Sequence, residues 1–415
     1  MKTKSSFLQA LFGVITLAIV SGAMAQENTS LKFAFGDHAA QKGWTAVTPT
    51  NLYSAAAGHG FEPGAELSST DYVTSEKPFL FSVQLPEGSY AVTVLMNDKA
   101  GEAVTTVKAE QRRLMLEKMQ FRPGTLATRT FIVNVRTPRI SDTEKVKLKK
   151  RELKTETVEW DDKLTLEFNG KHPTLRALVI VPTNVPTVFL AGDSTVCDQP
   201  AEPWNSWGQM LPRFFAPDVA VANYAESGET IKSSLGAKRF DKVFSLMKPG
   251  DYLFVQFGHN DMKDKTTNAL ALYKSNLKKI VARTRELGGT PALITSMERK
   301  AGVETNTLAS YPQTVRAVAK EENCALIDLN PMSRTFYKAL GADLDKAFQD
   351  GTHHNNYGSY ELAKCVVEGI KQAKLPLAKS IVADFGDFDP AKPDDVNKFE
   401  MPASPTVSKE KPLGN

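Results

Sequence analysis

Up to about residue 183, short apolar segments alternate with turns rich in glycine, proline and aspartate, and no long amphipathic stretch separates them. Segments of this length and composition are typical of β-strands. We expect strands at residues 31–35, 79–85, 90–96, 129–135, 163–168 and 175–181. Strands that follow one another without long helices between them predict an all-β sandwich for residues 26–183.

A proline-flanked linker from Pro182 to Pro186 separates this region from one with a different pattern. There, continuous apolar runs of strand length alternate with amphipathic stretches of helix length. Strands are expected at residues 188–191, 219–223, 252–257, 292–296 and 325–328, and helices at 268–287, 309–322 and 358–373. This alternation predicts a doubly wound parallel sheet, an α/β domain, over residues 186–375.

The two ends of the chain differ in composition from both predicted domains. Lys2 and Lys4 precede an apolar run, and Ala23-Met24-Ala25 provides a cleavage pattern of small residues. We therefore expect a signal peptide over residues 1–25 and an exported protein, periplasmic or secreted, without a membrane span. Residues 376–415 form a proline-rich extension that we expect to pack along the surface around 381–399 and to be mobile from about Ser404.

Charge excludes one class of partner. The formal net charge is +4, and removing Lys2 and Lys4 with the signal peptide leaves +2. Because nucleic-acid binding needs clustered basic residues, we expect no nucleic-acid partner. The charged stretch over residues 144–159 is interpreted as a solvated strand edge or insertion.

The cysteines do not form a framework. Cys197, Cys324 and Cys365 lack the spacing of a zinc site and allow at most one disulfide within the molecule. We interpret them as small buried apolar residues.

Polar motifs follow three of the strands predicted in the second domain, at the edge where open parallel sheets bind ligands. A fourth motif precedes the last long helix. The motifs are Gly192-Asp193-Ser194-Thr195, Ser227-Gly228-Glu229-Thr230, Gly258-His259-Asn260-Asp261 and Asp350-Gly351-Thr352-His353.

These motifs contain the parts of a serine hydrolase. A serine hydroxyl needs a histidine to take its proton, and the imidazole needs an acceptor that fixes its tautomer. Ser194, His353 and Asp350 fit these three roles, since Asp350 and His353 stand three residues apart in a turn. The backbone N–H groups of Ser194 and Gly228 and the side chain of Asn260 are candidates for the oxyanion hole.

Several neighbours have alternative interpretations. His354 competes with His353 for the role of base, but the Asp-x-x-His spacing favours His353, and we expect His354 to be a solvated or substrate-edge residue. Asp193 is interpreted as a side chain that organises the loop by bonding nearby backbone N–H groups. Trp204 and Trp207 follow the nucleophile, and stacking on a sugar stays open beside a place in the core.

The four motifs resemble the four blocks of the SGNH, or GDSL-type, hydrolases, and they occur in the same order. The resemblance implies a flavodoxin-like α/β/α sandwich with Ser194, Gly228, Asn260 and His353 as the characteristic residues and Asp350 as the acid of the triad. It implies no metal and no organic cofactor.

Within that family, the segments around Ser194, Asn260 and His353 most resemble rhamnogalacturonan acetylesterases, over residues 186–375. The region before them is similar to the galactose-binding-like β-sandwich that precedes this esterase domain in some bacterial relatives. The residues that carry this second resemblance are Phe33, Phe35, Gly36, Trp44, Tyr53, Gly60 and Phe61. Binding of sugar by this domain stays open, although aromatic residues such as its Trp44, Tyr53, Phe61 and Trp160 more often belong to a core than to a sugar-binding surface.

One position departs from these relatives, which commonly carry Ser-Gly-Arg-Ser where this chain has Ser227-Gly228-Glu229-Thr230. The backbone donor of Gly228 is kept. We expect Glu229 to face the substrate and to disfavour a substrate carboxylate through like charge. His259 is a candidate for substrate binding, and the alternative is that it organises the Asn260 loop through a backbone hydrogen bond.

The resemblance implies a carbohydrate esterase that removes acetyl groups from pectin, with rhamnogalacturonan as the leading substrate. Its partner would be an acetylated plant polysaccharide or oligosaccharide. The alternatives are another SGNH activity, on acetylated xylan or short-chain esters, and a non-catalytic glycan-binding protein. Release of acetate from an ester separates the enzymes from the binding protein.

Overall fold

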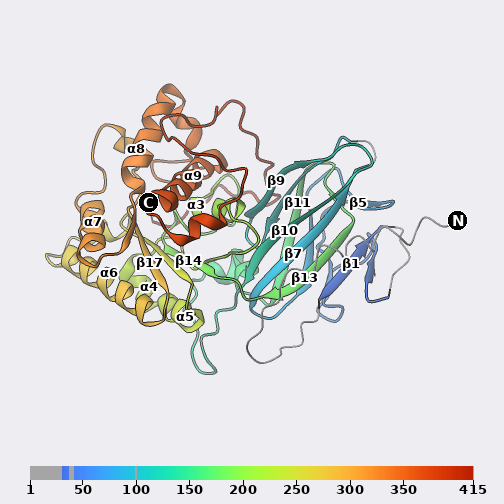
Figure 1. Cartoon of the computed structure of the whole chain (residues 1–415), viewed down its shortest axis with the longest axis horizontal. Coiled ribbons are helices and arrows are strands. Elements are labelled where there is room, and N and C mark those ends of the chain that lie inside the picture. The colour runs from blue at the N-terminus through green and yellow to red at the C-terminus, as the bar shows by residue number, and fades with distance from the viewer. Residues whose placement is uncertain (1–29, 37–41, 99–100, 415) are drawn as a thin grey trace.

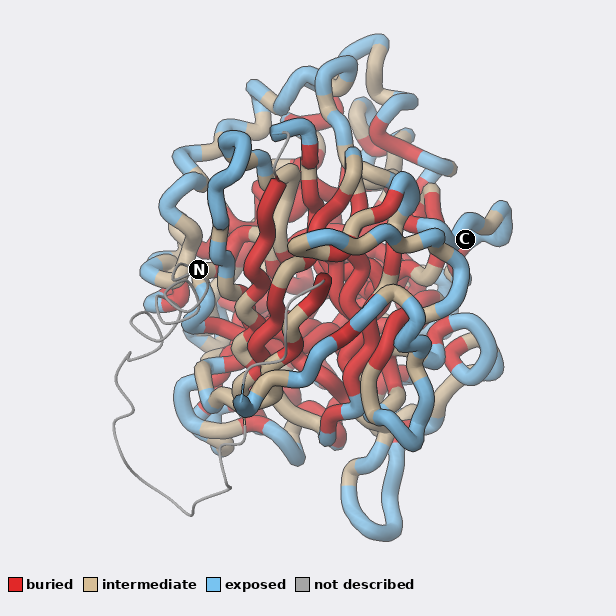
Figure 2. The backbone as a smooth tube through the Cα atoms, turned by 90° about the vertical axis from the view of Figure 1, so that its right-hand side faces the viewer, coloured by how far each residue is buried: buried red, intermediate tan, exposed pale blue. Residues whose placement is uncertain are grey.

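The computed structural model describes residues 30–36, 42–98 and 101–414, and Figure 1 shows a β-rich part beside a part that combines helices with a sheet. The predicted signal peptide lies outside the described residues. Figure 2 shows buried residues concentrated in the strands of the interior and exposed residues in the outer loops. In the described part of the chain, no helix has both the length and the hydrophobicity needed to cross a bilayer.

The β-rich part has short strands, as its sequence predicts. They are β1 (Leu31–Phe35), β2 (Thr45–Val47), β3 (His59–Phe61), β4 (Ser68–Ser69), β5 (Val73–Thr74), β6 (Phe79–Gln84), β7 (Gly88–Asn97), β8 (Val104–Ala109), β9 (Arg113–Gln120), β10 (Leu126–Val135), β11 (Lys163–Lys171), β12 (Thr174–Leu175) and β13 (Ala177–Thr183). The described residues form two five-stranded sheets, ordered β10-β7-β13-β1-β2 and β3-β6-β11-β8-β9, and a small sheet β12-β5-β4. Neighbouring strands run antiparallel, whereas β1 and β2 run parallel.

The two larger sheets share one apolar core. Phe35 and Val92 from one sheet lie in the same buried cluster as Phe81 and Leu166 from the other. The rings of Phe35 and Phe81 meet edge to face, with centroids 5.0 Å apart. Side chains from two facing sheets therefore interdigitate, which is the packing of a β-sandwich.

Strands β8 and β9 were not predicted, because the prediction relied on apolar residues and the buried side chains of β8 include polar ones. Thr105, Thr106 and Lys108 are buried in β8, and β9 carries charged residues. Among the aromatic residues considered for sugar binding, Phe61 and Trp160 are buried, whereas Trp44 and Tyr53 are partly exposed. Sugar binding by this part stays a prediction.

The second part contains β14 (Thr187–Gly192), β15 (Ala220–Asn223), β16 (Tyr252–Gln256), β17 (Thr290–Ile294) and β18 (Ala325–Ile327), with helices α3 (Trp207–Met210), α4 (Ile231–Gly236), α5 (Arg239–Leu246), α6 (Ala269–Glu286), α7 (Tyr311–Glu321), α8 (Leu329–Leu340) and α9 (Asn356–Gln372). The strands form a parallel sheet in the order β15-β14-β16-β17-β18. Numbered along the chain this order is 2-1-3-4-5, the flavodoxin-like arrangement.

Helices cover both faces of this sheet, because alternate strand residues point in opposite directions. Val188 and Leu190 of β14 belong to the apolar cluster that includes Phe336 of α8 and Val366 of α9. Phe189, between them, belongs to a second cluster built on helices α4 to α7. The second part is thus an α/β/α sandwich, as predicted.

The charged stretch at residues 144–159 is solvated only in part: Glu144 and most of its lysines are exposed, as expected of an insertion, but several of its glutamates are not. It contains the short helices α2 (Glu152–Thr155) and η1 (Thr157–Glu159), and Val146, Glu152, Glu156 and Glu159 are buried. Val146 joins the apolar cluster of the helix-covered sheet. The stretch lies between the two parts, and its charges have buried partners that the local sequence does not reveal.

The C-terminal extension packs further than expected. Side chains between Ile381 and Phe399 lie against the apolar cluster around α9, as predicted. Beyond them, Ser404 and Pro412 are also buried, and Val407 forms a bridge with Glu202. The segment from Ser404 thus packs against the protein in this structure, and its mobility stays a prediction.

The three cysteines are free within the described structure, with Cys197 and Cys365 buried and Cys324 partly exposed. Burial of two of them agrees with their interpretation as small apolar residues.

Two glycines make a matched test of packing beside β14. A Cβ on Gly208 of α3 would lie 2.1 Å from the carbonyl oxygen of Val196, whereas a Cβ on exposed Gly236 of α4 meets open space. Gly208→Ala should lower the free energy of unfolding by ~1–3 kcal/mol, while Gly236→Ala should raise it by ~0.5–1 kcal/mol. Urea denaturation measures both, and equal effects of the two substitutions would contradict the packing described.

Candidate active site

Ser194 lies in a buried turn directly after β14. The carboxylate of Asp193 accepts hydrogen bonds from the backbone N–H and hydroxyl of Thr195 at 3.0 and 2.7 Å, which fixes the turn as predicted for Asp193. Gly192 is required here, because a Cβ would lie 2.8 Å from the carbonyl oxygen of Gln256. Aspartate and glycine therefore present Ser194 at the carboxyl end of the strand.

The structure brings Ser194, His353 and Asp350 together in one line. The Ser194 Oγ lies 2.8 Å from His353 Nε2, and His353 Nδ1 lies 2.9 Å from Asp350 Oδ2. The other oxygen of Asp350 accepts from the backbone N–H groups of Thr352 and His353, both at 2.7 Å. Although burial acts to raise it, the hydrogen bond and charge of His353 hold the pKa of Asp350 well below its usual range.

This line has the chemistry of a serine nucleophile with its base. In this arrangement the imidazole can accept the proton of Ser194, and ionised Asp350 can fix its tautomer and stabilise the cation that would form. The ring of Trp204 stands edge-on to His353, with centroids 5.9 Å apart. Trp207 is instead a core residue whose indole N–H donates to Gln256 Oε1 at 2.9 Å.

His354 points away from the nucleophile. Its Nε2 lies 2.9 Å from the hydroxyl of Tyr337, and its ring packs on Phe348 with centroids 4.2 Å apart. Burial, with a smaller effect from the charge of His353, lowers the pKa of His354 to about 3. His354 is buried, so the expectation of a solvated or substrate-edge residue is corrected.

Gly228 and Asn260, the other two candidate oxyanion donors, lie at the same place. Gly228 has a φ of +76°, a conformation that favours glycine. A Cβ placed on Gly414 would lie 2.7 Å from Asn260 Oδ1 and 3.2 Å from the Cα of Gly228, so both border one position. Gln199 joins this loop to the nucleophile turn, since its side-chain amide donates to the Ser194 carbonyl at 2.6 Å and to Ser227 Oγ at 3.4 Å.

Glu229 does not face a substrate. Its side chain is 2% exposed, and its carboxylate lies 2.7 Å from Lys149 Nζ. It also accepts a short hydrogen bond from Ser233 Oγ, and Arg239 lies 3.9 Å away. The predicted substrate contact is therefore corrected: the residue after Gly228 turns inward because basic side chains distant in sequence hold it there.

His259 is also turned into the protein. Its Nδ1 lies 3.3 Å from Asp193 Oδ2 and its Nε2 lies 3.0 Å from the carbonyl oxygen of Met297. Both ring nitrogens therefore face acceptor groups inside the protein. With 1% exposure and two internal partners, His259 positions the Asn260 loop, and the prediction that it binds substrate is corrected.

Residues of the β-rich part complete the nucleophile turn, and the sequence did not identify them. From the turn between β8 and β9, the Gln111 side chain donates to the Asp198 carbonyl at 2.7 Å and Arg112 donates to the Gln199 carbonyl at 3.0 Å. The guanidinium of Arg113 pairs with the Asp198 carboxylate at 2.9 Å. The partners in each of these two hydrogen bonds are 87 residues apart, and no local motif links them.

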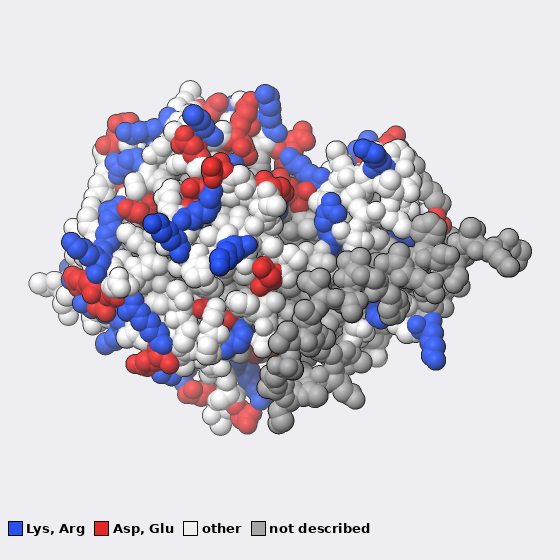
Figure 3. All heavy atoms as spheres, in the orientation of Figure 1, with Lys and Arg blue, Asp and Glu red and all other residues white. Residues whose placement is uncertain are grey.

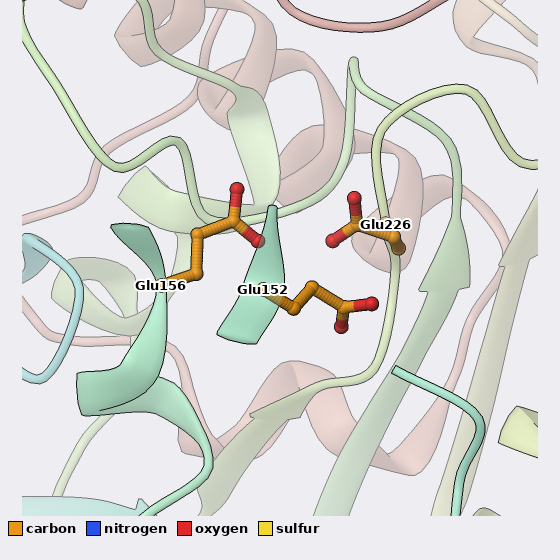
Figure 4. Close-up of side chains that lie close together, drawn as sticks. All are labelled: Glu152, Glu156 and Glu226. Atoms are coloured by element: carbon orange, nitrogen blue, oxygen red, sulfur yellow. The ribbon is translucent and has the colours of Figure 1, made fainter. Parts of the chain in front are cut away.

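Buried charges brace the Gly228 loop from the other side. Oxygen atoms of Glu152, Glu156 and Glu226 lie within 4.8 Å of one another, as Figure 4 shows. Arg239 pairs with Glu152 at 2.6 Å, and Arg151 pairs with Glu226 and Glu156 at 2.9 and 2.7 Å. Burial, then the charge of Glu226, raise the pKa of Glu156 to about 9, so a proton reduces the repulsion between the carboxylates.

The helix-covered part of the chain is similar to a known protein family. Residues 190–359 match the GDSL-like Lipase/Acylhydrolase family. Rhamnogalacturonan acetylesterase RhgT of Bacillus subtilis (strain 168) is 34% identical over 221 residues, which cover 48% of this chain and 95% of RhgT.

A second relative extends over both parts of the structure. The uncharacterized esterase YxiM of Bacillus subtilis (strain 168) is 24% identical over 381 residues, covering 85% of this chain and 94% of YxiM. Its crystal structure covers 84% of this chain and 99% of its own, with 25% identity and a TM-score of 0.47.

Replacing the protonated carboxyl of Glu156 by an amide tests the charge cluster. The folded state keeps the proton up to about pH 9 while an unfolded glutamate releases it near 4.5, so stability falls as the pH rises between these values. Glu156→Gln has no titratable group at this position and so lacks this pH-dependent loss. Its free energy of unfolding should therefore rise relative to that of the wild type as the pH increases from 5 to 9. Urea denaturation midpoints of the variant and the wild type at several pH values measure this difference. Glu66→Gln, at an exposed position, is the control. A difference between Glu156→Gln and the wild type that does not change with pH would contradict the buried proton.

Proposed function

The chain belongs to the GDSL-like lipase/acylhydrolase family and is a carboxylic ester hydrolase, and we propose that it removes acetyl groups from rhamnogalacturonan through Ser194, His353 and Asp350. The observation that carries the catalytic assignment is the hydrogen-bonded line from Ser194 Oγ through His353 to Asp350. The support for the substrate is the similarity to RhgT over 95% of that protein.

The reaction has two halves. Ser194 Oγ attacks the acetyl carbonyl while His353 takes the hydroxyl proton, and the resulting oxyanion accepts hydrogen bonds from the backbone N–H groups of Ser194 and Gly228 and from Asn260 Nδ2. The intermediate collapses as His353 returns the proton to the sugar oxygen, which leaves as a hydroxyl. Water activated by His353 then hydrolyses the acetyl-serine and regenerates the enzyme.

A polysaccharide substrate fits an exported protein, and we infer export from the predicted signal peptide over residues 1–25. The β-rich part, residues 26–183, would then be an accessory domain of the galactose-binding-like type. Its contacts with Asp198 and Gln199 support a structural role in the active site, in addition to any role in binding glycan.

Acetate release tests this function. The wild-type protein should release acetate from acetylated rhamnogalacturonan faster than from acetylated homogalacturonan or xylan, and Ser194→Ala should release it ~10⁴-fold or more slowly from each. The proposal fails for the substrate if xylan is preferred, and for the nucleophile if Ser194→Ala keeps a few per cent of the activity.

The two histidines provide the matched control within the same assay. His353→Ala should lose as much activity as Ser194→Ala, because the triad acts as a unit. His354→Gln should stay within about tenfold of the wild type, since His354 bonds Tyr337 and not Ser194. If His354→Gln lost more activity than His353→Ala, and both variants had the melting temperature of the wild type, His354 would be the base instead of His353.

A further inference from the structure

Two basic side chains flank the candidate oxyanion site. Lys263 ends the short helix η3 (Asp261–Lys263), and its Nζ lies 3.1 Å from Asn260 Oδ1. Arg299 donates to the carbonyl oxygen of His259 at 3.0 Å and makes a short bond to Thr352 Oγ1. One base thus contacts the oxyanion loop, and the other links that loop to the turn that carries His353.

These two side chains differ from the other bases near the site. Lys149, Arg112 and Arg239 each form an ion pair with a glutamate. Within residues 30–36, 42–98 and 101–414, neither Lys263 nor Arg299 has such an ion pair; Lys263 is exposed and Arg299 is partly exposed. Burial, then the positive charge of Arg299, lower the pKa of Lys263, while the negative charge of Asp193 acts on both bases in the opposite direction.

The ammonium group of Lys263 lies close to the position in front of the candidate oxyanion donors. Its Nζ donates a short hydrogen bond to the carbonyl oxygen of Gly414, and Gly414 borders Gly228 and Asn260. An acceptor oxygen in front of the oxyanion donors is therefore within reach of this ammonium. Glu229, the carboxylate predicted to repel an acidic substrate, is buried and paired, so it does not oppose such binding.

We propose that Lys263 and Arg299 bind the carboxylate of a uronic acid next to the acetylated sugar and so select acidic substrates. This rests on the proposed function, because it concerns the substrate of the same site. An arginine at the position of Glu229 is then not needed for carboxylate recognition, since the positive charge comes from two other loops. Figure 3 shows basic and acidic side chains interspersed on one face, so the selection is local and not a property of that whole surface.

Binding to the inactive protein tests this inference without requiring turnover. In the Ser194→Ala background, calorimetry gives the Kd of digalacturonate and of neutral galactobiose at low and high salt. Lys263→Gln and Arg299→Gln should each reduce the preference for the acidic disaccharide by about tenfold, and salt should weaken it. The quantity to compare between variants is the ratio of the two Kd values. Substitution of Lys263 also removes its hydrogen bond to Gly414, but that loss affects both ligands alike and leaves the ratio unchanged.

Lys265→Gln is the matched control, since Lys265 lies in the same loop and bonds only the carbonyl of Met262 among the described residues. It should keep the wild-type preference. The inference is overturned if digalacturonate binds no better than galactobiose, or if Lys265→Gln reduces the preference as much as Lys263→Gln. Failure of the proposed function is a separate result, namely no acetate release from rhamnogalacturonan.

A different observation concerns the C-terminal strap, defined as residues 402–414. Its first part is anchored between the two parts of the protein: Lys108 Nζ donates to the Pro402 carbonyl at 2.7 Å and to Ser404 Oγ at 2.8 Å. The backbone N–H of Ser404 donates to Glu202 Oε1 at 3.0 Å. These groups are buried, so the anchor is firm.

The strap then passes the imidazole and ends at the oxyanion donors. The Trp204 indole, which stands against His353, donates to the Ser408 carbonyl at 3.2 Å. Further along, the Cβ of Leu413 lies 3.0 Å from the position of a Cβ on Gly228, and Gly414 lies against Asn260. Ser194 is only 2% exposed in this arrangement.

We infer that the strap inhibits the enzyme by occupying the position of the substrate carbonyl, and that residues 409–414 must leave before an ester binds. Lys409, Glu410 and Lys411 are exposed, whereas Pro412 and the anchor at Ser404 are buried, so release of the end requires Pro412 to leave its contacts. Displacement of the end leaves the anchor and the two parts of the protein in place.

Two variants test the strap on 4-nitrophenyl acetate. Deletion of residues 409–415 should raise kcat/KM severalfold. Gly414→Val should raise it as well, because a Cβ at Gly414 would lie 2.7 Å from Asn260 Oδ1 and displace the end of the strap. Gly386→Ala, whose Cβ meets open space, is the control and should leave kcat/KM unchanged.

The inference is overturned if Gly414→Val, with the melting temperature of the wild type, leaves kcat/KM unchanged or lowers it. A loss of activity in both variants would make the strap a part of the binding site instead of an inhibitor. Neither outcome depends on which polysaccharide is the substrate.

Discussion

The arrangement of the site depends on one constraint: the turn that carries Ser194 is buried, and buried backbone carbonyls need hydrogen-bond donors. The β-rich part provides them, with Gln111 bonding the carbonyl of Asp198 and Arg112 that of Gln199. Arg113 adds an ion pair to the Asp198 carboxylate. Removing the β-rich part would take the Gln111 donor from the Asp198 carbonyl, whereas the Gln199 carbonyl would keep a hydrogen bond from Gln209 and the Asp198 carboxylate one from Asn223. The β-rich part thus contributes to the structure of the candidate site.

The same reasoning explains the charged segment between the two parts. Buried glutamates are costly unless they are paired or protonated. Here Arg151 and Arg239 pair with them, and Lys149 joins Glu229 to the carbonyl of Ser227. The loop with Gly228 is thus fixed from behind by charges of a segment that precedes it by about 78 residues. Preorganised donors need such support, because an oxyanion hole works only if its geometry is set before the reaction.

The sequence predicted the elements whose cause is local. Residues 31–35 and 163–168 show strand patterns, and the order of strands and helices after residue 186 predicted a parallel sheet with polar motifs at one edge. The spacing of Asp350 and His353 predicted a hydrogen bond within a single turn, which the structure contains. Strands β8 and β9 were missed because their buried polar residues have partners elsewhere in the fold, as Lys108 has in Ser404.

The direction in which a loop side chain points could not be predicted from the sequence. Glu229 follows Gly228 directly, yet its side chain points into the protein because Lys149 and Arg239 lie there. Lys263 carried no motif, yet it points to the position in front of Asn260. Which side of a loop a side chain takes is decided by partners far away in the chain, and substrate selection depends on that side. The residues proposed to perform the chemistry are therefore more readily found from sequence than the residues proposed to select the substrate.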